Sequence, residues 1–216
     1  MDLTSVLFYQ PQQFQLRFGQ IFAESLPAQC LPGYRGAVFV PQSYLASGTY
    51  RLYDLASGQS LTLQAVTEEN NPLWQRHGMA VARYTPPPNL EQGEKQEKLL
   101  RGFQCALVQE QCAILSQAEQ WSYEFLSART IGTQKIVSYP PVSHLLAKVV
   151  RDRYALSTCN IAASLAQPGG GAWLTEEIDA ICEQLIKLVG GRAMLRGQMV
   201  YLRMLFLLLN RIYLEN

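Results

Sequence analysis

Charge is scarce in this sequence, and none of it is concentrated. Asp, Glu, Lys and Arg make up 16% of the 216 residues, the formal net charge is +1, and the basic residues form no run. Proteins whose main partner is a nucleic acid usually carry a basic patch or stripe that meets the phosphates. The sequence therefore predicts no nucleic-acid partner.

Histidine and clustered cysteine are scarce as well. There are two histidines and five cysteines, with no Cys-x-x-Cys pair and no Cys/His cluster. The cysteines are Cys30, Cys105, Cys112, Cys159 and Cys182. An odd, dispersed set indicates neither a zinc site nor a disulfide framework. We expect no metal, and free, mostly buried thiols in a reducing, cytoplasmic compartment.

No segment has the pattern of a leader peptide or of a membrane span. Asp2 is acidic and no uninterrupted apolar region follows it, unlike in a secretory signal peptide. The most apolar segment, residues 194–214, is interrupted by Arg196, Arg203 and Arg211, whereas a transmembrane helix needs about 20 predominantly apolar residues. Because it is apolar on nearly every side, this segment predicts a helix buried against bundle neighbours or another subunit.

Common catalytic motifs are missing too. The sequence shows no Ser/His/Asp arrangement and no phosphate-binding glycine loop. We expect His144 on the face of a helix and His77 in a loop. The glycine-rich segment 167–171 follows a predicted helix, so we expect it to be a flexible connection.

Residues 37–85 contain four short segments that are rich in β-branched and aromatic residues. Each is bounded by Gly, Pro, Ser or Asn, which is typical of strands. The segments are 37–40, 49–53, 60–66 and 79–84. Ser57-Gly58 predicts a hairpin turn between the second and the third. We expect one small antiparallel sheet, preceded by a short helix at about residues 12–24.

The second half of the chain has the pattern of long helices. Apolar residues recur at three- and four-residue spacing on two helices within residues 107–165, which gives each helix one apolar stripe. The stripe of the second helix consists of Val142, Leu145, Leu146, Val149, Val150 and Tyr154. Gly132 separates the two helices, and Pro141 suits the first turn of the second.

Two further helices are expected over residues 176–188, with Thr175 as the N-cap, and 194–214. The three prolines at 86–88 can continue neither a helix nor a central strand, so we place a domain boundary near residue 90. The predicted fold class is α+β. A small antiparallel β region in residues 1–90 precedes an up-down four-helix bundle in residues 91–216.

The order of these parts resembles the C-terminal two-thirds of an acyl-CoA dehydrogenase. The first helical hairpin reads Arg129-Thr130-Ile131-Gly132, where that family has an Arg-x-x-Phe-Gly-type motif. The third helix ends in Gly190-Gly191, like the family's Gly-Gly pair. Ile212-Tyr213 stands near the position where many members carry Ile-Tyr-Glu-Gly-Thr. The resemblance covers residues 90–216, and residues 31–89 more loosely.

The resemblance implies a site for flavin dinucleotide (FAD) between subunits, and an acyl thioester as the substrate. Arg129, Gly190 and Gly191 correspond to cofactor-binding positions. The fork of an arginine suits phosphate oxygens, and glycine lets the backbone approach a cofactor closely. Glu215 is the candidate catalytic base, which would remove the α-proton of the acyl group.

The chain also departs from the family pattern. It has room for only one helix of the N-terminal helical domain of that family. Ile131 replaces the Phe of the motif, and Pro140 replaces a Gln of the next helix. Leu214 stands at the position of the base, and Glu215 comes one residue later, which is about 100° of rotation on a helix.

Two interpretations follow. In the first, which these departures favour, the chain is a truncated, degenerate acyl-CoA dehydrogenase-like protein without bound flavin. It would then be a non-autonomous subunit or binding module of a homo- or hetero-oligomer joined through the helical bundle. In the second, the chain retains FAD and acts as an acyl-thioester dehydrogenase (α,β-desaturation) when paired with a complementary subunit.

Overall fold

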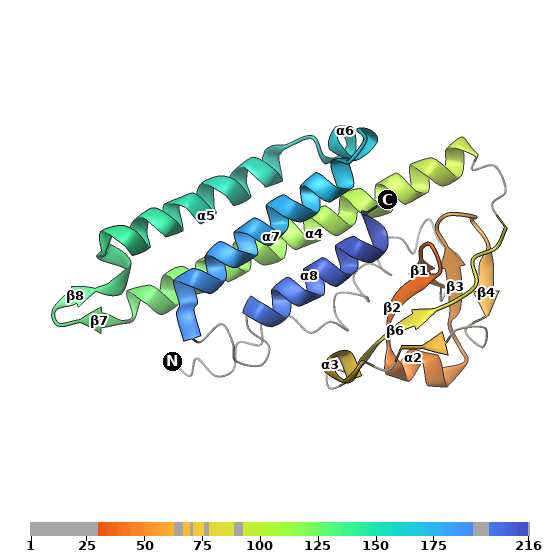
Figure 1. Ribbon diagram of the computed structural model, residues 1–216, viewed down its shortest axis with the longest axis horizontal. Coiled ribbons are helices and arrows are strands. Elements are labelled where there is room, and N and C mark those ends of the chain that lie inside the picture. The colour runs from red at the N-terminus through yellow and green to blue at the C-terminus, as the bar shows by residue number, and fades with distance from the viewer. Residues whose placement is uncertain are drawn as a thin grey trace. The chain divides into compact units, whose positions relative to one another are not determined.

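The computed structural model describes residues 30–62, 67–69, 71–75, 78–88, 93–191 and 199–215 (Figure 1). The helix expected near residues 12–24 and His77 lie outside these ranges. The described residues belong to two compact units. One holds the residues up to Leu107 together with Arg211–Tyr213, and the other holds Val108–Asn210 together with the residues from Leu214 onward.

The first unit contains two small sheets, each of three strands. Their elements are β1 (Cys30–Gly33), β2 (Ala37–Pro41), α2 (Gln42–Ser47), β3 (Arg51–Asp54), β4 (Ser60–Thr62), β5 (Thr67–Glu68), α3 (Pro72–Gln75) and β6 (Met79–Arg83). The strand orders are β1-β3-β4 and β2-β6-β5. All four predicted strand positions therefore contain strands, but these strands form two sheets instead of one.

The β3–β4 hairpin confirms the turn predicted at Ser57-Gly58. The backbone amide of Ser57 donates to the carboxylate of Asp54 over 2.7 Å, and Gly58 has a φ of +74°, which favours glycine. The β1–β3 pair is parallel, unlike the antiparallel pairing expected throughout. Parallel pairing is possible here because β2 and α2 lie between the two strands in the chain and provide the crossover.

Buried apolar side chains hold the strands of this unit together. One cluster consists of Leu31, Val38, Val40, Leu52, Ala80, Ala82 and Tyr84. Every residue of β2 is buried, so Phe39 points away from Val38 and Val40 into a second apolar environment. There its ring meets that of Trp74 edge-on, with the centroids 5.4 Å apart. A strand buried on both sides has a continuous apolar sequence, as β2 has.

The helices are longer than the strands and are joined by short connections. They are α4 (Glu94–Ser127), α5 (Pro140–Thr158), α6 (Ile161–Ala166), α7 (Gly170–Val189) and α8 (Met199–Tyr213). Between α4 and α5 lie β7 (Thr130–Ile131), β8 (Gln134–Lys135) and the 3-10 turn η2 (Ile136–Ser138). The break predicted at Gly132 is the turn of the β7–β8 hairpin, and α5 opens with two prolines.

Four side-chain contacts show that the long helices form an up-down bundle. The contacts are Arg153–Glu119 between α5 and α4, Gln184–Asp152 between α7 and α5, Arg203–Asp179 between α8 and α7, and Gln111–Asn210 between α4 and α8. Each helix therefore touches two neighbours, and successive long helices run in opposite directions. The α+β fold class and the four-helix bundle are confirmed.

The segment between α5 and α7 differs from the prediction. The second long helix ends at Thr158, and Asn160 then caps α6 by accepting a 3.0 Å hydrogen bond from the amide of Ala163. Asn and Ser/Thr side chains favour such caps because they satisfy free amides at a helix start. Thr175 is not an N-cap. It lies inside α7 and donates to the carbonyl of Gly171 over 3.0 Å.

Gly170 and Gly171 are buried in α7, so the flexible connection expected over residues 167–171 is wrong for these two glycines. Gly171 is buried in the first turn of α7. A Cβ atom at this position would lie 2.1 Å from the backbone oxygen of Leu214. Glycine is therefore needed here for close packing of α7 against the segment that follows α8. Over the described residues, no helix has the length and apolarity needed to cross a membrane.

Candidate functional site

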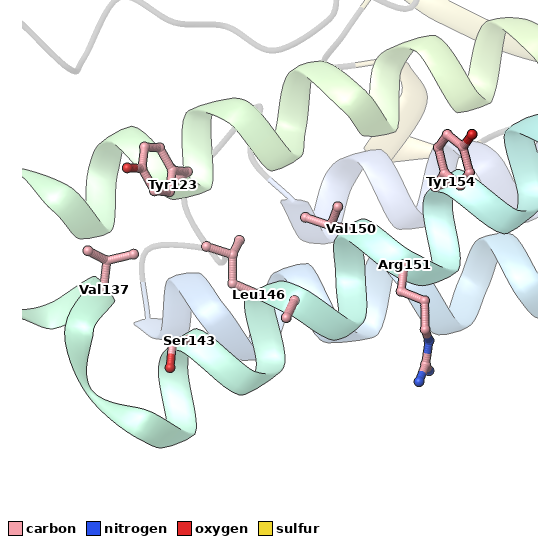
Figure 2. A pocket seen from close by; sticks show the side chains of 8 residues that line it. Tyr123, Val137, Ser143, Leu146, Val150, Arg151 and Tyr154 are labelled. Atoms are coloured by element: carbon pink, nitrogen blue, oxygen red, sulfur yellow. The ribbon is translucent and has the colours of Figure 1, made fainter.

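An apolar groove of about 570 Å³ runs along α5 beside the C-terminal half of α4 (Figure 2). Its lining comes from α4, η2 and α5. The residues are Tyr123 of α4, Val137 of η2, and Ser143, Leu146, Ala147, Val150, Arg151 and Tyr154 of α5. Figure 2 shows Tyr123, Val150 and Tyr154 following one another along the groove, whereas the guanidinium of Arg151 points away from them.

The groove exists because α5 is covered on only one side. Of its 19 residues, only Val149 and Leu156 are buried. The exposed fractions are 39% for Val150, 64% for Tyr154 and 47% for Tyr123. Val150 and Tyr154, which belong to the predicted apolar stripe of this helix, are therefore not buried. The apolar side chains of α5 occupy a larger part of its circumference than α4 and α7 cover.

The ion pair between Arg153 and Glu119 shows which residues of α5 lie beside which residues of α4. Because the two helices are antiparallel and rise equally per residue, moving along α4 from Glu119 corresponds to moving back along α5 from Arg153. Tyr123 is therefore level with Val149 and Val150, which places its ring at the edge of the groove.

Both helices carry charged side chains near the groove, and Arg151 is the charged residue that lines it. On α4, Glu124 is exposed and accepts a 2.8 Å hydrogen bond from Gln120. On α5, Lys148 is exposed, and Arg151 forms an ion pair with Asp152. Burial alone would raise the pKa of Asp152, but hydrogen bonds from Gln184 and Arg151, with the charges of Arg151 and Lys148, lower it below the ordinary value. Arg151 therefore faces a carboxylate that stays ionised.

Arg129, predicted to contact a cofactor phosphate, lies between α4 and the β7–β8 hairpin. It is exposed, and its guanidinium carbon lies 5.0 Å from the centre of the Phe125 ring. The backbone carbonyl of Arg129 accepts a 2.9 Å hydrogen bond from Ile136, so the base of the side chain is anchored. The guanidinium itself is accessible to an anion.

The predicted glycine pair and the predicted base lie at opposite ends of α7. Gly190 and Gly191 are exposed after its last turn, and a Cβ atom on either would meet nothing within 4 Å. Glu215 follows Leu214, whose carbonyl packs against Gly171 in the first turn. A helix of 20 residues is about 30 Å long. Within one chain, Glu215 and the glycine pair therefore do not form one site.

Arg129 lies at the same end of the bundle as the glycine pair. It follows the last turn of α4, and α4 and α7 run in the same direction in an up-down bundle. The structure thus brings Arg129 and Gly190-Gly191 to one end and leaves Glu215 at the other. The groove with Tyr123 was not predicted from sequence. A signal for it exists in the width of the apolar arc on α5, since Val150 and Tyr154 lie beside the stripe centred on Val149.

The remaining polar groups do not form an open reactive site in the described part of the chain. His144 is exposed on α5, as predicted. All five cysteines are free, and burial raises the pKa of each thiol, to about 11 for Cys112. Raised thiol pKa values disfavour the reactive thiolate. Among the described residues, no group of three His, Cys, Asp or Glu residues could hold a metal ion.

A buried carboxylate has a structural role in the first unit, which holds the two three-stranded sheets and is called the β unit below. Asp54 is only 1% exposed, and the hydroxyl of Tyr84 donates a hydrogen bond to it. Burial raises the pKa of Tyr84, and the bond to Asp54 raises it further. Asp54 also accepts from the amide of Ser57. The pair therefore joins the β3–β4 turn to the end of β6 and is closed to substrate.

No protein-family model matches this sequence, and no curated protein matches it. Among solved structures, an acyl-CoA dehydrogenase from Slackia heliotrinireducens is similar to it in fold, with a TM-score of 0.47 and 11% sequence identity. The similarity covers 94% of this chain and 67% of that one.

Proposed function

We propose that this protein is a non-catalytic subunit of a larger assembly. It would attach through the surface formed by Tyr123, Leu146, Val150 and Tyr154, which we call the α4–α5 face. The observation that carries the proposal is the exposure of Tyr123, Val150 and Tyr154 along one groove. Contiguous exposed apolar surface on a folded protein typically marks an interaction site.

The composition of this face favours a protein partner. Tyrosine is enriched among the residues that dominate the energy of protein interfaces, because it offers a large apolar ring with a polar end. The aliphatic side chains of Leu146 and Val150 lie between the two tyrosine rings in Figure 2. Arg151 adds a charged group at the edge of the groove, as in an interface with an apolar centre and a polar rim.

The placement of Glu215 supports a non-catalytic role for the chain by itself. Removal of an α-proton requires a carboxylate within hydrogen-bond reach of the reacting carbon. Arg129 and the glycine pair lie at one end of the bundle, and Glu215 lies near Gly171 at the other. A complete reaction centre would need a base from another chain.

The test compares protein isolated under native conditions from the cells that produce it. We expect the wild-type chain to sediment in a complex, and Val150→Asp combined with Tyr154→Ser to sediment as a monomer. Met204→Ser is the matched control, because Met204 of α8 is also exposed, at 41%, but lies outside the α4–α5 face. Equal thermal unfolding temperatures would show that all variants are folded. A complex that survives the double substitution would contradict the proposal.

A second candidate function is that of a flavin-dependent acyl-thioester dehydrogenase paired with a complementary subunit. The exposure of Arg129 and of Gly190-Gly191 at one end of the bundle favours it. The guanidinium of Arg129 would hold a phosphate of FAD, and the backbone at the glycine pair is open to a cofactor. FAD would supply the hydride acceptor, while the base would come from the partner.

An absorption spectrum separates the two functions. The purified protein is measured in the visible range before and after incubation with excess FAD and gel filtration. Retained flavin that is lost on Arg129→Ala, but not on Arg211→Ala on α8, would favour the dehydrogenase. A protein that stays colourless after incubation would favour the non-catalytic subunit.

A further inference from the structure

We draw no further inference here: the strongest candidate, the pocket between α6 and the start of α7 that is lined by Ser164, Gln167, Pro168, Gly169, Gly170 and Trp173, rests on a helix N-terminus beside one exposed tryptophan, and nothing in the described part of the chain shows which ligand would occupy it.

Discussion

Arg153 of α5 donates to the carboxylate of Glu119 of α4, and the two side chains are only 18% and 16% exposed. We expect Arg153→Met or Glu119→Gln to lower the free energy of unfolding by roughly 1–3 kcal/mol, between the values for surface and buried ion pairs. Each single change leaves one charge in a largely buried place. The combined variant should cost less than the sum of the two single changes. Urea unfolding of the three variants measures this, and additive losses would contradict a direct pair.

Gly171 should tolerate no side chain. In Gly171→Ala the new methyl group would lie 2.1 Å from the carbonyl oxygen of Leu214. The backbone must move, and we expect a loss of about 2–3 kcal/mol of unfolding free energy, as for an overpacked core. Gly191→Ala is the control, because its methyl group would meet nothing within 4 Å. Thermal unfolding of both variants decides the question, and similar midpoints would show that this contact is not tight.

Gln111 and Asn210 form an amide pair inside the bundle. Both are 0% exposed, and Gln111 Nε2 donates to Asn210 Oδ1 over 2.7 Å. Their other amide atoms, Gln111 Oε1 and Asn210 Nδ2, have no partner in the described part of the chain. We expect Asn210→Leu alone to lower the unfolding free energy by about 1–3 kcal/mol, because Gln111 loses its acceptor.

Replacing both amides of this pair should recover most of that loss. In Gln111→Leu with Asn210→Leu, no buried polar side chain at these positions remains without a partner. Chemical denaturation of the single and double variants gives the comparison. A double variant less stable than Asn210→Leu would show that the amides have a further, favourable interaction.

Alkaline pH should weaken the fold. Burial raises the pKa of Tyr213, and burial with the bond to Asp54 raises the pKa of Tyr84. Unfolded tyrosines ionise near pH 10, so above that pH the unfolded state binds fewer protons than the folded state. The stabilising effect is complete below about pH 10 and is lost above it, at about 1.4 kcal/mol per pH unit for each tyrosine.

Tyr213→Phe tests this pH dependence. Its unfolding free energy should fall less steeply than that of the wild type above about pH 10. Deprotonation of the buried thiols also lowers the free energy of unfolding as the pH rises, and it begins at a lower pH. Because these thiols are present in both proteins, their contribution cancels in the comparison. Parallel pH profiles from urea unfolding would contradict a neutral, buried Tyr213 in the folded protein.

Local sequence patterns predicted the helices and strands better than they predicted which of these elements pack or pair with one another. The three- and four-residue spacing predicted α4, α5, α7 and α8, because one buried stripe per helix is a local property. The strand β1 (Cys30–Gly33) was not predicted, and neither was its pairing with β3, because the register depends on a crossover and not on either strand. Gly171 was taken for part of a flexible connection because glycine in a sequence does not reveal the close approach of Leu214.

The candidate surface was predictable only in part, for a similar reason. The spacing of Val150 and Tyr154 shows that they belong to an apolar arc, but not how many neighbours cover that arc. Arg129 and Gly190-Gly191 were identified from resemblance, and their common location follows only from the directions of α4 and α7. The distance of Glu215 from them required the packing of Leu214 on Gly171.

The hydroxyl of Tyr213 donates to the carbonyl of Pro32 over 2.9 Å, across 181 positions of the chain. During synthesis, the strands near Pro32 leave the ribosome long before Tyr213 is made. The β unit also takes in Arg211–Tyr213, so its packing is completed only after the bundle helices have been translated. The apolar cluster of residues 31–84 can therefore assemble first, and the C-terminal end of the chain closes the packing of this unit last.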